Sequence, residues 1–181
     1  MKLWYTASKV EAGCDEAGRG CLAGPVFAAA VILPKDFFHP LINDSKKLSL
    51  PKRLEAREII IESALAWNVQ KIDAEKIDEI NILNASILGM NEAVEHLSIK
   101  PELLLIDGNR FNSLLNIPYY CIIKGDATYL SIAAASILAK TFRDEFMEQI
   151  DLEFPKYKWA KNKGYPTKDH QEAILKHGFS P

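Results

Sequence analysis

Three short apolar segments of this sequence each give way to a glycine-containing turn that carries one or two carboxylates. The segments, with the acids that follow them, are residues 10–14 before Asp15 and Glu16, residues 103–106 before Asp107, and residues 119–123 before Asp126. Apolar runs of this length, bounded by turn residues, are typical of strands in a buried sheet. Ligands of α/β proteins collect beyond the carboxyl ends of such strands. The pattern therefore predicts an α/β sheet with four acids gathered at one edge.

The first acidic pair precedes a Gly-Arg-Gly turn. Neighbouring residues of a regular strand face opposite sides of the sheet, so Asp15 and Glu16 can share one site only if the backbone turns there, and we expect such a turn. Gly18 and Gly20 permit it and let main-chain N–H groups approach a ligand, while Arg19 supplies a permanent positive charge. Taken alone, this stretch is equally consistent with a solvated acidic turn.

The remaining strands and helices are expected from apolar patterning. Residues 26–33 form a continuous apolar run between two prolines, which predicts a strand deep in the sheet, and a weaker alternation predicts another over residues 67–72. Helices are predicted over residues 50–64, along the apolar stripe from Ile80 to Leu97, over residues 130–150 and over residues 168–176. The order of these elements predicts a mixed sheet with helices on both faces, and small residues at 133–136 would let one helix lie close to it.

Composition fits a single globular domain over residues 1–181. The chain has 48% apolar and 25% charged residues, and no apolar run approaches the roughly 20 residues that span a bilayer. Since the N-terminus also lacks the apolar region of a signal peptide, we expect a cytoplasmic monomer with no membrane association. Cys14, Cys21 and Cys121 form no CxxC pair and are odd in number, which argues against a disulfide framework or a structural zinc site and predicts buried thiols.

Four clustered carboxylates require compensating charge. Two carboxylates about 4 Å apart repel by roughly 4 kcal/mol at an effective dielectric constant of about 20, so the cluster needs bound cations or protons. Oxygen-only ligands favour hard ions, and we expect two Mg²⁺ or Mn²⁺ ions there. Such a pair of ions promotes in-line displacement at phosphorus without a nucleophilic serine or cysteine. The sequence has no GxxxxGK[ST] loop, which argues against a P-loop NTPase.

The net charge of −2 does not by itself suggest a nucleic-acid-binding protein. Residues 155–168, however, carry five lysines, no acid and three aromatic side chains. A local basic surface of this kind can hold a phosphate backbone, with binding that weakens as salt rises. Residues 155–181 are therefore expected to form a basic and aromatic substrate-binding segment. Lys46 and Lys47 would either contact phosphates or belong to a solvated polar loop.

A series of short motifs runs in order over almost the whole chain. They are Asp15-Glu16-Ala17-Gly18-Arg19-Gly20, Asp44-Ser45-Lys46-Lys47-Leu48-Ser49, Asp107-Gly108, Lys124-Gly125-Asp126, Ala134-Ala135-Ser136-Ile137, Ala139-Lys140, Arg143-Asp144, and Lys163-Gly164-Tyr165 with His170. Together they resemble ribonuclease HII, of the type 2 RNase H family, and the arginine of the Gly-Arg-Gly turn favours this type over HIII. The resemblance implies an RNase H-like fold: a five-stranded mixed sheet flanked by helices, with a short C-terminal helical segment.

The resemblance also implies an activity. The expected enzyme hydrolyses the RNA strand of RNA–DNA hybrids and nicks 5′ of single ribonucleotides embedded in duplex DNA, leaving 3′-hydroxyl and 5′-phosphate ends. By the resemblance, the metal-binding catalytic acids are Asp15, Glu16, Asp107 and Asp126. The turn that reads the ribose 2′-hydroxyl is Gly18, Arg19 and Gly20. The resemblance further implies that Tyr165 stacks on the adjoining deoxyribose, and phosphate contacts are expected from Lys46 and Lys47. The 2′-hydroxyl is what distinguishes RNA from DNA locally, and close main-chain groups can address it.

Two other functions remain open. A non-catalytic nucleic-acid-binding module with this fold would be expected to lack one of the four acids. A different RNase H-like enzyme, such as a DNA junction nuclease or a sugar-kinase-like ATPase, does not account for the Gly-Arg-Gly turn together with the segment around Tyr165. Arg143 and Asp144 are expected to form surface ion pairs, with Asp144 outside the metal site. For Lys140 and His170 both functional and structural roles stay open.

Overall fold

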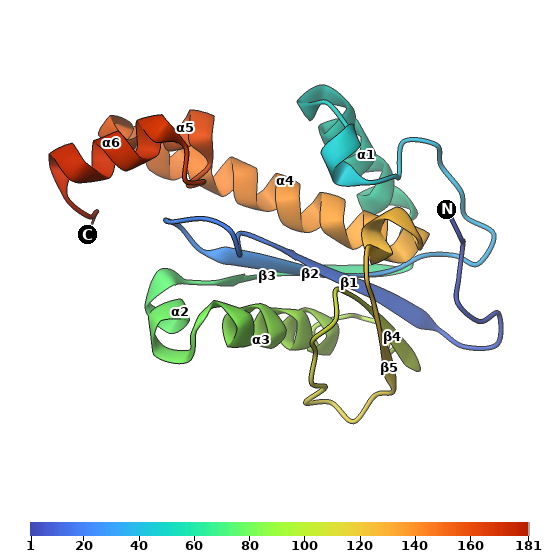
Figure 1. Ribbon diagram of the computed structural model, residues 1–181. Coiled ribbons are helices and arrows are strands. Elements are labelled where there is room, and N and C mark those ends of the chain that lie inside the picture. Colours follow the sequence, from blue (N-terminus) through green and yellow to red (C-terminus); the bar gives the residue numbers. More distant parts are fainter. Residues whose placement is uncertain (181) are drawn as a thin grey trace.

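The computed structural model describes residues 1–180 and shows a five-stranded sheet with helices on both faces (Figure 1). The strands are β1 (Glu11–Ala17), β2 (Val26–Ile32), β3 (Ala66–Ile72), β4 (Leu103–Asp107) and β5 (Tyr119–Ile122). Their order across the sheet is β3-β2-β1-β4-β5. β2 pairs antiparallel with β1 and β3, whereas β4 pairs parallel with β1 and β5. The expected mixed sheet is confirmed.

Helices cover both faces of this sheet. The α-helices are α1 (Leu50–Ser63), α2 (Ala74–Ile80), α3 (Ile82–Glu95), α4 (Leu130–Glu153), α5 (Trp159–Asn162) and α6 (Lys168–His177), and the short 3₁₀ helices are η1 (Ser45–Lys47), η2 (Gly125–Ala127) and η3 (Pro155–Tyr157). In Figure 1, α2 and α3 lie on one face, α1 and α4 on the other, and α5 and α6 beside the C-terminal end of α4. Within residues 1–180, no helix is long and apolar enough to cross a membrane.

The long helix α4 lies against β1 at backbone contact. The small residues of α4 are fully buried, as expected for a helix that lies close to the sheet. They are Ala133, Ala134 and Ala135. At Gly13 of β1, a Cβ atom would lie 2.2 Å from the carbonyl carbon of Ser131. Only glycine fits at this crossing, and α4 is therefore seated directly on the strand that carries the first acidic pair.

The stripe that begins near residue 80 forms a helix preceded by a second, shorter one. α2 ends at Ile80, and Asn81 adopts a φ of 65°. The Asn81 side chain accepts hydrogen bonds from the N–H groups of Leu83 and Asn84, and so caps the start of α3. α2 has no buried residue, so its sequence needs no repeating apolar positions. For this reason α3 could be predicted from its apolar stripe and α2 could not.

The three cysteines differ in burial. Cys14 is buried in β1, as predicted, whereas Cys21 is half-buried and Cys121 is exposed. The prediction of buried thiols is therefore wrong for Cys121. It lies on β5, an edge strand of the sheet that has a neighbour on only one side.

The C-terminal segment packs onto the end of α4 through an apolar cluster. Tyr157 and Trp159 are buried beside Met147 and Ala173, and the two rings stack with centroids 4.8 Å apart. Both rings therefore belong to the apolar core that holds the C-terminal segment on α4. Tyr165 is the aromatic residue of residues 155–168 that stays partly exposed.

Candidate active site

The four predicted acids lie at one end of the sheet, on neighbouring segments. Asp15 and Glu16 belong to β1, Asp107 is the last residue of β4, and Asp126 lies in η2, shortly after β5. β1 and β4 run parallel, with Cys14 opposite Ile106, so the residue after each of these partners is an acid. The register of the sheet thus places Asp15 and Asp107 side by side.

Backbone hydrogen bonds bring Asp126 to Asp107. The N–H groups of Gly125 and Asp126 donate to Oδ1 of Asp107, at 2.6 and 3.4 Å. A Cβ atom at Gly125 would lie 2.6 Å from Cδ1 of Ile132, so glycine leaves the room that this turn needs beneath α4. The glycine before the fourth acid therefore serves the geometry of the site.

The backbone does not turn at Asp15 and Glu16, contrary to the expectation from the sequence. β1 continues past both residues, which pair in register with Ala29 and Ala28 of β2. Their side chains leave opposite faces of the strand, yet both lie close enough to Asp107 to interact with it electrostatically. β4 ends at Asp107, so no β4 residue pairs with β1 beyond Cys14. The edge of β1 that faces β4 is therefore open at Asp15 and Glu16, and both acids can reach one site there.

Burial raises the pKa of three of these acids. The pKa of Asp15 lies well above its ordinary value because the carboxyl group is buried and lies near Glu16 and Asp107. Burial also raises the pKa of Glu16, against the opposing effect of Arg19. The pKa of Asp107 is raised by burial and then by the charge of Asp126. The fully ionised cluster is therefore unfavourable unless positive charge joins it.

Two basic side chains contact the cluster from outside. Lys46 Nζ donates to Asp126 Oδ2 at 3.2 Å, and Arg19 Nη1 donates to Glu16 Oε1 at 2.9 Å. Burial acts to lower the pKa of Lys46, but the neighbouring acids, Asp126 first, raise it overall. Lys47 instead points away, with Nζ 3.9 Å from Asp44. Of the two lysines, Lys46 therefore contacts one of the four acids, whereas Lys47 lies near Asp44.

The donor set fits a hard divalent cation, although the side chains do not form a ready cage. Among residues 1–180, no three His, Cys, Asp or Glu side chains are arranged to hold a metal ion. Several carboxylate oxygens already accept hydrogen bonds, for example Asp15 Oδ1 from the Glu16 N–H at 2.8 Å. The four possible ligands are buried or half-buried carboxylates that repel one another, and carboxylate oxygens are ligands that Mg²⁺ and Mn²⁺ prefer. A bound cation would relieve the repulsion between these carboxylates.

The Gly-Arg-Gly turn lies against Tyr165. Gly18 has a φ of 115°, and a Cβ there would lie 2.6 Å from Nε of Arg143. A Cβ at Gly20 would lie 4.0 Å from Cε1 of Tyr165, which is ordinary contact distance. The N–H of Leu22 also donates to the carbonyl of Gly164 at 2.8 Å. The structure therefore brings the predicted sugar-reading turn and Tyr165 together, although 145 positions separate Gly20 from Tyr165 in the sequence.

Arg143 holds these two segments in place, and the prediction that it lies on the surface is wrong. The side chain is 1% exposed and donates to the carbonyls of Pro25, Ala23 and Lys163, at 2.9, 3.0 and 2.7 Å. A planar guanidinium can bind several carbonyls at fixed angles, which a flexible ammonium does less well. The spacing of Ala139, Arg143 and Met147 along one face of α4 could have signalled this burial.

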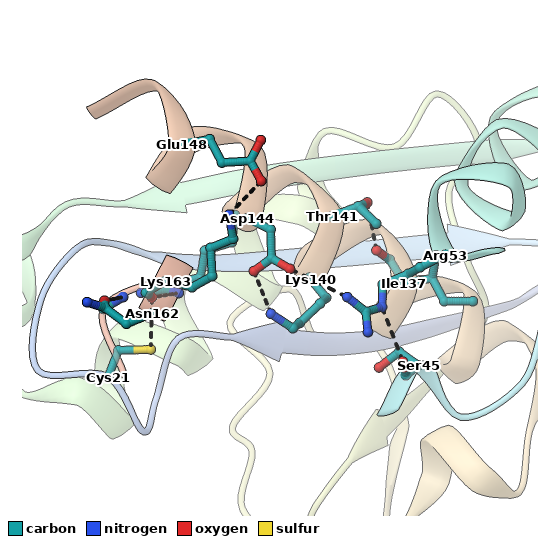
Figure 2. Close-up of polar contacts among 12 residues, drawn as sticks. Cys21, Ser45, Arg53, Ile137, Lys140, Thr141, Asp144, Glu148, Asn162 and Lys163 are labelled. Carbon is teal, nitrogen blue, oxygen red and sulfur yellow. Dashed lines mark hydrogen bonds and ion pairs between the residues drawn. The ribbon is translucent and has the colours of Figure 1, made fainter. Parts of the chain in front are cut away.

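Asp144 is also buried, again contrary to prediction. Figure 2 shows its carboxylate between Lys140, at 2.5 Å, and Arg53 of α1, at 3.5 Å. The side chain therefore pairs with two cations outside the carboxylate cluster. Lys140, whose role the sequence left open, places Nζ 5.6 Å from the ring centroid of Tyr165.

His170 supports the backbone of Tyr165. The imidazole is fully buried, and its Nε2 accepts a hydrogen bond from the indole N–H of Trp159 at 3.0 Å. Nδ1 then carries the proton of the neutral ring and donates to the carbonyl of Tyr165 at 3.0 Å. His170 thus has a structural role with a direct effect on the position of Tyr165.

Four of the five lysines of residues 155–168 are exposed, and Lys163 is partly covered. Lys158 and Lys161 are exposed and lie 3.9 and 3.5 Å from Asp169. Lys163 pairs with Glu148 of α4. The exposed basic surface therefore keeps four of the five lysines, and nearby acids partly offset their charge.

Comparisons with known proteins identify the family and the fold of this chain. The family model for Ribonuclease HII matches residues 12–181. A Ribonuclease HII of Bacteroides thetaiotaomicron is 62% identical over 172 residues, 95% of this chain and 86% of the relative. The ribonuclease H2 of Pyrococcus horikoshii is similar in structure, with a TM-score of 0.78, 24% identity and coverage of 94% of this chain and 90% of that one. An RNase HIII crystallised with Mn²⁺, named Bst-RNase HIII, gives a TM-score of 0.72 at 20% identity, covering 94% and 63%.

The fold and the family lead to the same conclusion. The structural neighbours share the RNase H-like fold, which confirms the fold expected from the motifs. The family model covers nearly the whole chain, and the relative from Bacteroides thetaiotaomicron is far more similar than fold alone would require. This chain belongs to the ribonuclease HII family and is a hydrolase of the ribonuclease H type.

Proposed function

We propose that this protein hydrolyses the RNA strand of RNA–DNA hybrids and nicks duplex DNA 5′ of single embedded ribonucleotides, leaving 3′-hydroxyl and 5′-phosphate ends. One observation carries the proposal: the carboxylate cluster stands at the strand ends, and the Gly18–Gly20 turn lies next to Tyr165 on the same chain. The first group offers chemistry at phosphorus, and the second offers a means of selecting the sugar.

In this proposal the four carboxylates hold two Mg²⁺ or Mn²⁺ ions. When bound, these ions would supply Lewis acidity that promotes attack by water and stabilises the departing oxygen. Asp15 and Asp107 are adjacent across the β1–β4 ladder, and Asp126 is tied to Asp107 through the backbone, so all three are fixed with little freedom. The side chain of Lys46 is exposed to solvent and lies beside Asp126. In this proposal its ammonium group binds a phosphate oxygen of the substrate.

Sugar selection would depend on the turn and the tyrosine beside it. Main-chain groups of Gly18, Arg19 and Gly20 can hydrogen-bond the ribose 2′-hydroxyl at a distance that side chains at these glycines would prevent. Tyr165 would stack on the adjoining deoxyribose. Lys158 and Lys161 supply exposed positive charge on the same C-terminal segment for the phosphate backbone.

The acids and the tyrosine all come from one chain, so we propose that a monomer suffices for this chemistry. An enzyme that starts the excision of ribonucleotides from DNA would act where DNA is replicated, and we therefore propose a cytoplasmic repair role. Sedimentation of the protein with its duplex would show whether one copy or two binds each site.

The test is a DNA duplex with one ribonucleotide, incubated with Mg²⁺ or Mn²⁺ and compared with the same duplex in EDTA. We expect a nick 5′ of the ribonucleotide that EDTA abolishes, with 3′-hydroxyl and 5′-phosphate ends. Equal cutting of an all-DNA duplex would favour another RNase H-like nuclease. Binding without cutting would favour the non-catalytic module, and a 2′,3′-cyclic phosphate end would contradict attack by water.

A further inference from the structure

Asp144 is a buried carboxylate that the proposed chemistry does not use. It is 6% exposed, lies on α4 and faces two cations that come from different parts of the chain (Figure 2). Lys140 Nζ lies 2.5 Å from Oδ1, and Arg53 Nη1 lies 3.5 Å from Oδ2. A carboxylate buried in this way is stable only while such partners remain, so the three residues form one unit.

Arg53 extends this unit to η1. Its Nε donates to the carbonyl of Ser45 at 3.2 Å, and its Nη2 donates to the carbonyl of Leu48 at 3.1 Å. These two carbonyls stand at the start of η1 and directly after its end. The Arg53 side chain is 14% exposed and is the link between this loop and the carboxylate of Asp144.

Lys46 depends on the placement of η1. Its side chain is 81% exposed, so few neighbouring side chains restrict it. Whether its Nζ lies near Asp126 therefore depends mainly on the position of the η1 backbone. The N–H of Lys46 donates to Oδ1 of Asp44, and the hydroxyls of Ser45 and Ser136 lie 3.1 Å apart. The second contact joins η1 to α4 directly, and Arg53 with Asp144 supplies the charged connection.

We propose that Asp144 is a positioning residue: through Arg53 it holds η1 where Lys46 can reach Asp126. Without the carboxylate, Lys140 and Arg53 would be two partly buried cations close together, and Arg53 would move toward water and release η1. The contacts of Asp144 and Arg53 support the predicted effect on the position of η1. The predicted effect on turnover rests in addition on the proposed function.

The first experiment measures the placement of η1 without using activity. Hydrogen exchange of residues 44–49 is compared between the wild-type chain, Asp144→Asn and Glu145→Gln. Glu145 is the matched control because it is the next residue of α4 and pairs with Arg57 of α1, at 2.8 Å, and not with Arg53. We expect exchange in residues 44–49 to be about fivefold or more faster in D144N and unchanged in E145Q. Equal exchange in all three proteins would overturn the proposal.

Arg53→Lys provides a second variant, should D144N fail to show a cooperative thermal transition. Lysine keeps the charge opposite Asp144 but cannot donate to the carbonyls of Ser45 and Leu48 at once. R53K should therefore also speed exchange in residues 44–49. Exchange at the wild-type rate in a folded R53K would contradict the route through Arg53.

The second experiment is a double-mutant cycle on the single-ribonucleotide duplex. D144N should lower kcat by about tenfold, in the range expected when a group at the site is misplaced, and should change KM less. In a Lys46→Ala background, D144N should lower kcat by less than about twofold, because the group it positions is gone. The same factor in both backgrounds would mean that Asp144 acts in another way. A wild-type chain that leaves the duplex uncut would refute the proposed function instead, and the exchange experiment would still decide the positioning role.

Discussion

The carboxylate of Asp107 accepts a hydrogen bond of 2.6 Å from the backbone N–H of Gly125. This contact joins the last residue of β4 to the turn that carries the fourth acid, so the geometry of the acidic cluster is set by main chain as well as by side chains. It also means that Asp107 can be tested by a change of charge at nearly constant shape, because asparagine keeps an oxygen acceptor.

Asp107→Asn should lower turnover at least about a hundredfold on a ribonucleotide duplex while the fold is kept, since a proposed metal ligand loses its charge within an intact site. Steady-state cleavage and thermal unfolding, measured on the same preparation, check both parts. Asp78→Asn is the control because Asp78 is exposed on α2, away from the site. Near-normal turnover of D107N would remove Asp107 from the catalytic group.

Asp15→Asn should stabilise the metal-free protein at neutral pH. Burial and neighbouring acids raise the pKa of Asp15, Glu16 and Asp107, so the folded chain holds these protons more tightly than the unfolded chain. Stability therefore falls as pH rises from the ordinary aspartate pKa of 3.8 through the raised folded values. In EDTA, the melting temperature of D15N should exceed that of the wild type at pH 7 and approach it at pH 4.

The same reasoning predicts the response to metal. Mg²⁺ should raise the melting temperature of the wild-type protein more at pH 7 than at pH 5, and should raise that of D15N less, because less repulsion is left to relieve. Asp36→Asn removes one exposed carboxylate and serves as the control for net charge. A stabilising effect of metal that is equal in D15N and D36N would argue against Asp15 as a ligand.

Arg143→Lys should destabilise the protein by about 2 kcal/mol, the scale of buried hydrogen bonds to a charged group. Lysine cannot satisfy the carbonyls of Ala23, Pro25 and Lys163 in one plane, so one or more would be left without a partner. Chemical denaturation measures the loss, and Arg110→Lys is the control because Arg110 is exposed. Equal stability of the two variants would show that the three carbonyl contacts contribute little.

Tyr165→Ala should reduce cleavage at a single ribonucleotide about tenfold, in line with the cost of removing an aromatic stacking partner. The affinity for Mn²⁺, followed by isothermal titration, should stay within about twofold, because Tyr165 lies outside the carboxylate cluster. Tyr165→Phe keeps the ring and should retain most of the activity. Unchanged selectivity of Y165A between ribonucleotide and all-DNA duplexes would count against the assigned role.

The sequence predicted the location of the four acids because the change from apolar strand to glycine-containing turn is a local signal. It did not predict how Asp15 and Glu16 share the site, since that depends on where β4 ends beside β1, a relation between residues about ninety positions apart. A backbone turn was expected where the strand in fact continues.

The burial of Arg143 and Asp144 was missed for a related reason. A charged pair on a long helix is usually solvated. The helical spacing of Arg143 with buried neighbours hints at burial, but the partners come from distant segments: carbonyls from the loop before β2 and from the segment after α5 for Arg143, and Arg53 of α1 for Asp144. α2 was missed because it buries no residue and so shows no apolar period. Local patterning therefore identified the acids and most elements, whereas the supports between segments required the assembled fold.

The contact between Gly13 and Ser131 has a consequence for how the two halves of the site stay aligned. β1 carries the first two acids, and α4 carries the residues that hold the Gly18–Gly20 turn and η1, so the close packing of this strand on this helix links the two sets of residues. An added methyl group at residue 13 would push the helix outward and move every support on α4 relative to the acids by the same displacement. The absence of a side chain at residue 13 thus helps to set the distance between the four acids and the supports on α4, at a point that belongs to neither.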